Sequence, residues 1–199
     1  MINSLFPKKG DDMHSIALNK EKISSWIRFL VTMLVASGFM ALCAQIRIHL
    51  PFSPVPFTGQ ILGMGLIGAF LGRVQGALAI VFYLLEGMMG LPVFSGGNAG
   101  LLYLFGPVGG YLLSFPIGAY LIGWVREKLV SKNLLKITFF VFLATQAVLA
   151  LGTLWLARFV GWDKALWLGW IPFLPFDVIK CYGIAWYIQF WRKRDCAKS

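Results

Sequence analysis

The sequence predicts an all-α membrane protein, a bundle of six transmembrane helices with both termini in the cytoplasm. Composition is the first observation: 58% of the 199 residues are hydrophobic and only 13% are charged, whereas soluble domains carry about 25% charged residues. Continuity is the second, because the apolar residues form long runs and not the alternating segments of about ten residues that a membrane β-barrel needs. The third is the position of the basic residues, which sets the number of crossings.

Lys and Arg form three clusters, with five in residues 8–28, four in 126–136 and four in 192–198. Such clusters beside membrane helices favour the cytoplasm, so an even number of crossings separates each from the next. Two apolar runs lie between the last two clusters. Four lie between the first two, or two if residues 58–90 re-enter without crossing. We choose six crossings, and the net charge of +10 then reflects topology and not nucleic-acid binding.

The chain divides into three regions. Residues 1–25 are a polar cytoplasmic leader, 26–191 a transmembrane domain and 192–199 a basic cytoplasmic tail. The three cysteines are an odd number and imply no disulfide framework. Five of the six spans are expected at residues 26–44, 59–72, 76–89, 137–159 and 167–191. The fourth span contains residues 106–110 and continues to about residue 125. A short turn at Trp162 is expected before the last span.

The first span carries small residues at helical spacing. Ala36, Ser37, Ala41 and Ala44 allow another helix to approach closely. Either that helix belongs to the same bundle, or Ser37 and Ala41 form a docking face for a partner membrane protein.

The following segment, residues 45–60, holds prolines at positions 51, 54 and 56, which exclude a straight helix. It is too apolar to be simply solvated, so we expect a lid over the mouth of the bundle. Arg47 and His49 within it are candidates to contact a solute or lipid head groups.

The second and third spans combine glycines with isolated polar residues. Gly68, Gly72 and Gly76 recur every fourth residue, which indicates close helix packing. Gln60 places a polar group at the mouth. Glu86, near the end of the third span, has three interpretations: it lies at the membrane interface, pairs with a base or contacts a solute.

Two more glycine-rich stretches indicate a cavity. Residues 95–100 (SGGNAG) bring backbone N–H groups and the Asn98 amide into one loop, and residues 106–110 (GPVGG) lie inside the fourth span. Irregular backbone at membrane depth is tolerated only where it is buried in protein or lines a cavity.

The sixth span contains two opposite charges. Asp177 and Lys180 are three residues apart and therefore on one face of a helix. An ionisable side chain in lipid costs about 2.5–3.5 kcal/mol, so the pair must face protein, water or a ligand. One interpretation is a grip on a small polar solute, and the other is a buried ion pair that fixes helix packing.

Four motifs occur in order along the chain: residues 54–60 (PVPFTGQ), 90–98 (GLPVFSGGN), 106–111 (GPVGGY) and 173–180 (FLPFDVIK). Together they resemble the BioY family, the biotin-specific substrate-binding (S) components of energy-coupling-factor transporters. The resemblance covers about residues 34–185. It implies a multi-pass protein of a prokaryotic plasma membrane that captures biotin at the outer face and works with a membrane scaffold protein and two ATPase subunits.

The resemblance also implies a site. Asp177, Lys180 and Asn98 match ligand-contacting positions, and Gln60 matches a motif position near them. A carboxylate can accept hydrogen bonds from the two N–H groups of the biotin ureido ring, and a lysine or an amide can donate to an oxygen. Three aromatic residues are expected to wall the bicyclic ring: Tyr83, Tyr103 and Trp170.

The sequence departs from the family pattern at two positions. Some relatives carry a basic residue directly after the Gly-Gly-Tyr motif, where this chain has Leu112. The biotin carboxylate is then left to Lys180, loop amides or solvent. Glu86 stands where an apolar residue is expected. The pair Ser37 and Ala41 resembles the family's alanine motif for scaffold docking.

Two other classes of function compete with biotin capture. A stand-alone proton-coupled carrier of a small vitamin-like solute would titrate Asp177 or Glu86 within the membrane, but the chain is short and has no clear inverted repeat. An enzyme is not expected, because no nucleophile–base pairing occurs. His14 and His49 are isolated, so no metal site is predicted. No cofactor is expected, and without a Walker A motif the chain depends on a partner for ATP hydrolysis.

Overall fold

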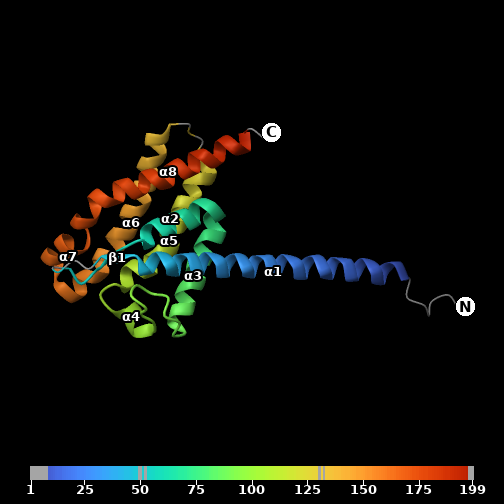
Figure 1. Ribbon diagram of the computed structural model, residues 1–199, viewed down its shortest axis with the longest axis horizontal. Helices are drawn as coiled ribbons and strands as arrows, with labels where there is room; N and C mark the ends of the chain where they lie inside the picture. Colours follow the sequence, from blue (N-terminus) through green and yellow to red (C-terminus); the bar gives the residue numbers. More distant parts are fainter. Residues whose placement is uncertain (1–8, 49–50, 52, 130, 132, 197–199) are drawn as a thin grey trace, which may run out of the picture.

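The structure is a computed structural model that describes residues 9–48, 51, 53–129, 131 and 133–196. His49, the first eight residues of the leader and the last three of the tail lie outside the described residues. The elements in chain order (Figure 1) are α1 (Lys9–Gln45), β1 (Arg47–Ile48), β2 (Phe57–Thr58), α2 (Gln60–Leu71), α3 (Arg73–Met88), α4 (Leu101–Phe105), α5 (Gly109–Lys128), α6 (Leu134–Val160), α7 (Trp162–Gly169), the 3-10 helix η1 (Ile171–Phe173) and α8 (Leu174–Cys196).

The predicted class, a helical membrane protein, is confirmed. Three segments of the described chain are long and apolar enough to cross a membrane: residues 22–45, 134–160 and 162–194. The second expected span corresponds to α2, whose 12 residues rise about 18 Å, less than the hydrocarbon thickness of about 30 Å. Because α2 packs against α1, α3, α5 and α8, this short helix is enclosed by its neighbours.

Helix α5 is central to the bundle, since it packs against α2, α3, α4 and α6. Glycine permits this packing. A Cβ atom on Gly68 would lie 2.4 Å from the carbonyl oxygen of Ala119, and one on Gly76 would lie 2.9 Å from the Cα of Gly68. The expected close packing around these glycines is confirmed.

Helix α1 begins at Lys9, well before the expected start of the first span at residue 26. No proline or glycine occurs between residues 11 and 37, so nothing in the sequence interrupts the helix there. Its C-terminal part packs against α2 and α3, while its N-terminal part projects beyond the bundle (Figure 1).

The expected last span differs in two ways. Residues from Trp162 form helix α7 and not a short turn, because Gly161, at φ 82°, redirects the chain and begins a new helix. The span is also interrupted at Trp170, where η1 separates α7 from α8. Pro172 and Pro175 fit at this break, because the first turn of a helix leaves N–H groups unpaired and proline has none to lose.

The described residues of the proline-rich segment (45–48, 51 and 53–60) form a lid over one end of the bundle. Strands β1 and β2 pair antiparallel, with Arg47 opposite Thr58. Beyond the ladder, the Ser53 hydroxyl donates to the carbonyl oxygen of Leu168 on α7 at 2.7 Å, and Val55 is buried. The segment is therefore tied both to the end of α1 and to α7.

Candidate functional site

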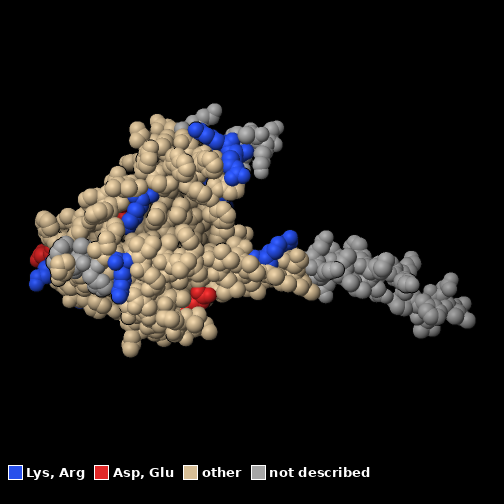
Figure 2. Space-filling view, in the orientation of Figure 1, with Lys and Arg blue, Asp and Glu red and all other residues tan. Residues whose placement is uncertain are grey.

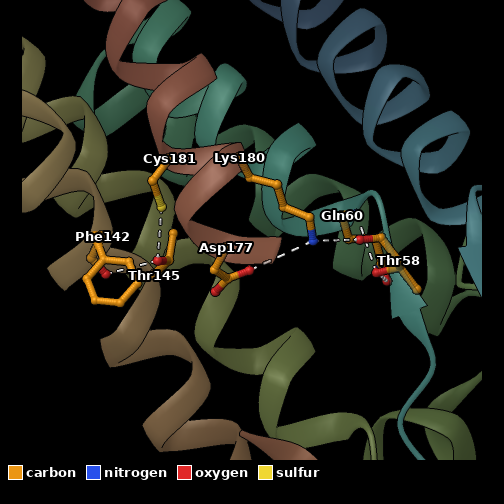
Figure 3. A network of polar contacts seen from close by, with 7 residues as sticks. All are labelled: Thr58, Gln60, Phe142, Thr145, Asp177, Lys180 and Cys181. Carbon is orange, nitrogen blue, oxygen red and sulfur yellow. Dashed lines mark hydrogen bonds and ion pairs between the residues drawn. The ribbon is translucent and has the colours of Figure 1, made fainter. Parts of the chain in front are cut away.

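Asp177 and Lys180 point toward each other at the beginning of α8 (Figure 3). The Lys180 Nζ atom is 3.8 Å from Asp177 Oδ1, and the two side chains are 12% and 0% exposed respectively. The break at η1 puts Asp177 in the first turn of α8, where the helix dipole favours negative charge. The pair therefore lies inside the protein and not in lipid.

The Asp177 carboxylate has no hydrogen-bond donor among the described residues. Both of its oxygen atoms are buried, and the Lys180 ammonium at 3.8 Å is beyond hydrogen-bonding distance. A buried polar group without a partner is costly and calls for an explanation. Two adjacent acceptor atoms without donors suit a ligand that brings two N–H groups.

Lys180 connects α8 to the lid. Its ammonium donates to the carbonyl oxygen of Thr58 at 3.2 Å and lies 4.0 Å from the centre of the Phe57 ring, within the range of a cation–π interaction. The Phe57 ring in turn stacks on Phe173 at 6.1 Å. Because an ammonium carries three N–H donors, the bond to the lid leaves donors for a ligand.

Gln60 belongs to a second network beside the first. It is 3% exposed. Its Oε1 accepts from the Thr58 hydroxyl at 3.1 Å, and its Nε2 donates to the Tyr83 hydroxyl at 3.0 Å. Tyr83 then donates to the carbonyl oxygen of Val93 at 3.0 Å. Thr58 joins the two networks, through its carbonyl to Lys180 and through its hydroxyl to Gln60.

A small cavity of about 30 Å³ lies between the lid and the helices, and both Lys180 and Gln60 line it. Its volume is enough for about two water molecules. Sequence reasoning missed most of the other lining residues, although several fall within the four motifs, and that membership is the signal that points to them. These residues include Val55, Thr58, Tyr111, Leu112, Phe115, Leu149 and Phe173.

Asn98 does not line this cavity. It is exposed, and its amide donates to the carbonyl oxygen of Ser95 at 2.7 Å. The loop lies against the lid, since a Cβ atom on Gly96 would lie 1.8 Å from Nη1 of Arg47. Glycine is needed here for this approach and for its φ of 78°.

The three predicted aromatic residues also lie outside the cavity lining. Tyr83 is fully buried and holds Gln60. Tyr103 stacks on Phe94 with ring centres 5.5 Å apart. Trp170 donates from Nε1 to Oε1 of Gln146 at 2.7 Å. All three therefore support neighbouring side chains in this structure.

Ser37 is packed inside the bundle. It is 1% exposed, and its hydroxyl donates to the carboxylate of Glu86 on α3. Ala41 is half-buried. Packing within the bundle, one of the two interpretations of the first span, therefore accounts for Ser37. Among the described residues the hydrogen-bond partner of Glu86 is this hydroxyl and not a base.

The site offers two carboxylate acceptors, one ammonium donor and apolar walls. Over the described part of the chain, no three His, Cys, Asp or Glu side chains gather to hold a metal ion. These groups can bind a small polar ring that has N–H donors and an oxygen acceptor.

Comparisons with known proteins agree on one family. The model described as the BioY family matches residues 14–195. The chain is 37% identical over 134 residues to "Probable biotin transporter BioY" of Pyrococcus horikoshii, covering 67% of this chain and 78% of the relative. It is 40% identical over 140 residues to "Biotin transporter BioY" of Thermotoga maritima, with the same coverage of each.

A third relative and a solved structure extend the match. "Biotin transporter BioY2" of Lactococcus lactis is 37% identical over 153 residues, covering 74% of this chain and 81% of the relative. The fold resembles a crystal structure described as the S-component for biotin from an ECF-type ABC transporter, with a TM-score of 0.76 and 27% identity. That match covers 85% of this chain and 93% of the other.

The substitution Asp177→Asn tests whether the ion pair holds the fold together. We expect the free energy of unfolding in detergent to fall by less than about 1 kcal/mol, or to rise, because the carboxylate has no donor to lose. A loss of about 3 kcal/mol or more would identify a structural ion pair instead. The control is Tyr83→Phe, which removes a hydroxyl bonded to Gln60 and Val93 and should cost about 1–3 kcal/mol.

Proposed function

The chain belongs to the BioY family, and from this we propose that it is the biotin-binding S component of an energy-coupling-factor importer. It is a transport protein and not an enzyme. Biotin is the transported ligand in this proposal and not a cofactor.

The observation that carries the proposal is the buried Asp177 carboxylate, whose two oxygen atoms find no donor in the part of the chain that the structure describes. The ureido group of biotin has two N–H donors and one carbonyl oxygen. In this proposal the N–H groups satisfy Asp177, which lies behind the present cavity lining, 3.8 Å from the Lys180 ammonium. Lys180, which does line the cavity, donates to the carbonyl oxygen. Hydrogen bonds to charged groups contribute about 1.5–3 kcal/mol each, so this arrangement gives both affinity and orientation.

The cavity walls suit the remainder of the bicyclic ring. Tyr111, Phe115 and Phe173 line the cavity, and Phe57 stacks on Phe173 beside Lys180. The present volume of about 30 Å³ is far below the roughly 300–1,000 Å³ of typical ligand sites. The lid and these side chains therefore move apart when biotin enters.

Among the other predicted site residues, Gln60 contacts the ligand and the aromatic residues support the site. Gln60 lines the cavity and reaches biotin directly, while Tyr83 holds its amide in place. Tyr103 stacks on Phe94, which packs against Tyr83, and Trp170 donates a hydrogen bond to Gln146.

The biotin carboxylate needs another partner, because Leu112 has no charge to offer. Strand pairing sets Arg47 opposite Thr58, whose carbonyl already holds the ammonium of the site. Arg47 also lies against Gly96, in the loop that carries Asn98. We therefore assign the carboxylate to the Arg47 guanidinium and the Asn98 amide, one strand away from the ureido end.

In this proposal six helices cross the membrane, α1, α2, α3, α5, α6 and α8, with residues 26–191 as the binding domain and both termini in the cytoplasm of a prokaryote. The helix ends support it. Arg192 donates to the carbonyl oxygens of Val125 (3.0 Å) and Arg126 (2.6 Å), and Arg126 donates to that of Phe70 (2.7 Å). Helices α2, α5 and α8 therefore end on one face, where basic residues concentrate.

An energising module completes the transporter, since the chain has no Walker A motif. We expect a membrane scaffold protein and two ATPase subunits, with the scaffold seated on α1. Because Glu86 covers the Ser37 hydroxyl, the contact involves Ala41 and its exposed neighbours rather than the hydroxyl itself.

Isothermal titration of the detergent-purified protein with biotin tests the assignment. We expect saturable binding, weakened about tenfold or more in Asp177→Asn and in Lys180→Ala, because each loses a charge-assisted bond. Asp163→Asn, which alters an exposed acid on α7, is the matched control and should bind like the parent. Absence of binding to the parent, or equal affinity in all variants, would sink the proposal.

The carboxylate assignment is tested with a second ligand, biotinamide, whose tail is uncharged. Arg47→Gln should weaken biotin about tenfold and leave biotinamide within about twofold, because only biotin loses a charge-assisted bond. Lys180→Ala should weaken both ligands. If Arg47→Gln affects the two ligands equally, the carboxylate is bound elsewhere.

Transport assays separate the proposed importer from a proton-coupled carrier. Proteoliposomes that hold this chain alone should not accumulate biotin under a proton gradient, and uptake should require the scaffold, the ATPases and ATP. Gradient-driven uptake by the chain alone, abolished in Glu86→Gln or Asp177→Asn, would favour the carrier. The ATP-driven importer should keep its uptake in Glu86→Gln.

A further inference from the structure

A second, larger hollow lies between α1, α2 and α8 and shares no lining residue with the cavity at the lid. Its volume is about 550 Å³, within the range of ligand sites. We propose that this groove, with an arginine pair at its end, binds one anionic phospholipid, with an acyl chain in the groove and the phosphate at the arginines.

The body of the groove suits an acyl chain. Val35, Ala36 and Phe39 of α1 face Leu66 and Phe70 of α2 across it, so the lining is almost wholly apolar. Val35 is 67% and Phe70 57% exposed, so neither is covered by other parts of the chain. In a membrane, the chemistry that matches such a surface is hydrocarbon.

Two guanidinium groups lie beside the Phe70 end of the groove. Trp191 packs edge-on against Phe70, with ring centres 6.0 Å apart. The guanidinium carbons of Arg126 and Arg194 are 5.9 Å and 5.6 Å from the centre of the same Trp191 ring. Two cations on one aromatic ring at the end of an apolar groove form a receptor for a phosphate.

Both arginines have donors to offer. Arg126 gives one N–H to the last turn of α2, and a guanidinium has five. Arg194 is exposed. Arg192, in contrast, donates to three carbonyl oxygens at the end of α5 and beyond it and serves the fold. The nearby acid Glu127 forms an ion pair with Arg73, with 3.2 Å between Oε2 and Nε. This pairing offsets the repulsion between the Glu127 carboxylate and a phosphate.

The charge of the surrounding surface favours a lipid over a free anion. Figure 2 shows Lys and Arg side chains gathered at the end of the bundle where α8 finishes, and Lys128 and Lys193 belong to the last turns of α5 and α8 there. Each basic residue near an anionic leaflet strengthens attraction roughly fivefold. An apolar groove that begins at such a cluster fits a molecule with both a phosphate and a long chain.

Native mass spectrometry of the purified full chain tests this, with phosphatidylglycerol, phosphatidylcholine of the same acyl chains, and glycerol phosphate as probes. We expect phosphatidylglycerol to bind about tenfold or more tightly than phosphatidylcholine, and glycerol phosphate not to be retained. Arg194→Gln should reduce phosphatidylglycerol binding roughly fivefold, and adding Arg126→Gln should reduce it further. Ala36→Phe, which fills the groove, should release both lipids while the arginines remain.

The matched control is Arg158→Gln. Arg158 stacks on Trp155 at 4.9 Å, but it lies in the last turn of α6, a helix that contributes no residue to the groove, so phosphatidylglycerol binding should not change. Biotin titration of each variant verifies folding separately. Equal binding of the two lipids, or no effect of Arg194→Gln and Ala36→Phe, would overturn the proposal. The proposal would also be overturned if a scaffold protein crosslinks to Val35→Cys and the protein shows no preference between the two lipids.

Discussion

The site depends on one electrostatic constraint, a carboxylate buried among helices with no hydrogen-bond donor among the described residues. Asp177 is tolerated because the chain surrounds it with partial compensation: the Lys180 ammonium at 3.8 Å and the beginning of α8, whose dipole favours negative charge. Neither supplies a hydrogen bond. In the proposed function, this remaining cost keeps a binding site ready, and a ligand that brings N–H groups offsets it.

Helix breaks, glycines and the lid all act together to position the polar residues around the carboxylate. The chain breaks at Trp170, so that α7 ends there and α8 begins at Leu174. Asp177 therefore lies in the first turn of α8. Gly68 and Gly76 bring α2 and α3 together beside α5, which sets Gln60 and Tyr83 within hydrogen-bonding distance. Thr58 then joins the lid to both polar networks. A compact site is thus built from helices too short or too broken to be ordinary spans.

Sequence reasoning predicts the parts of this protein that composition and spacing encode. Long apolar runs give the helical membrane class, and the spacing of Asp177 and Lys180 gives their common face. The short ladder and the positions of Thr58 and Tyr111 at the cavity escape it, because each depends on contacts between distant segments, such as Arg47 with Thr58. The helix at Trp162 escapes it because it depends on the backbone conformation of Gly161. Asn98 is easily noticed as a polar residue in a glycine loop, but the sequence does not indicate that its amide bonds to Ser95 within the same turn.

The strands β1 and β2 are only two residues long each. Their pairing bears on the rate at which a ligand dissociates from the proposed site. So short a pairing is marginal in water, and the Lys180 contact to Thr58 adds a single hydrogen bond to it. We expect the residence time of a bound molecule to be set by how often β1 and β2 separate, and not by the strength of the hydrogen bonds to Asp177. Changes in the β1–β2 ladder would then alter the residence time, while changes in the residues that bond the ligand would alter the affinity.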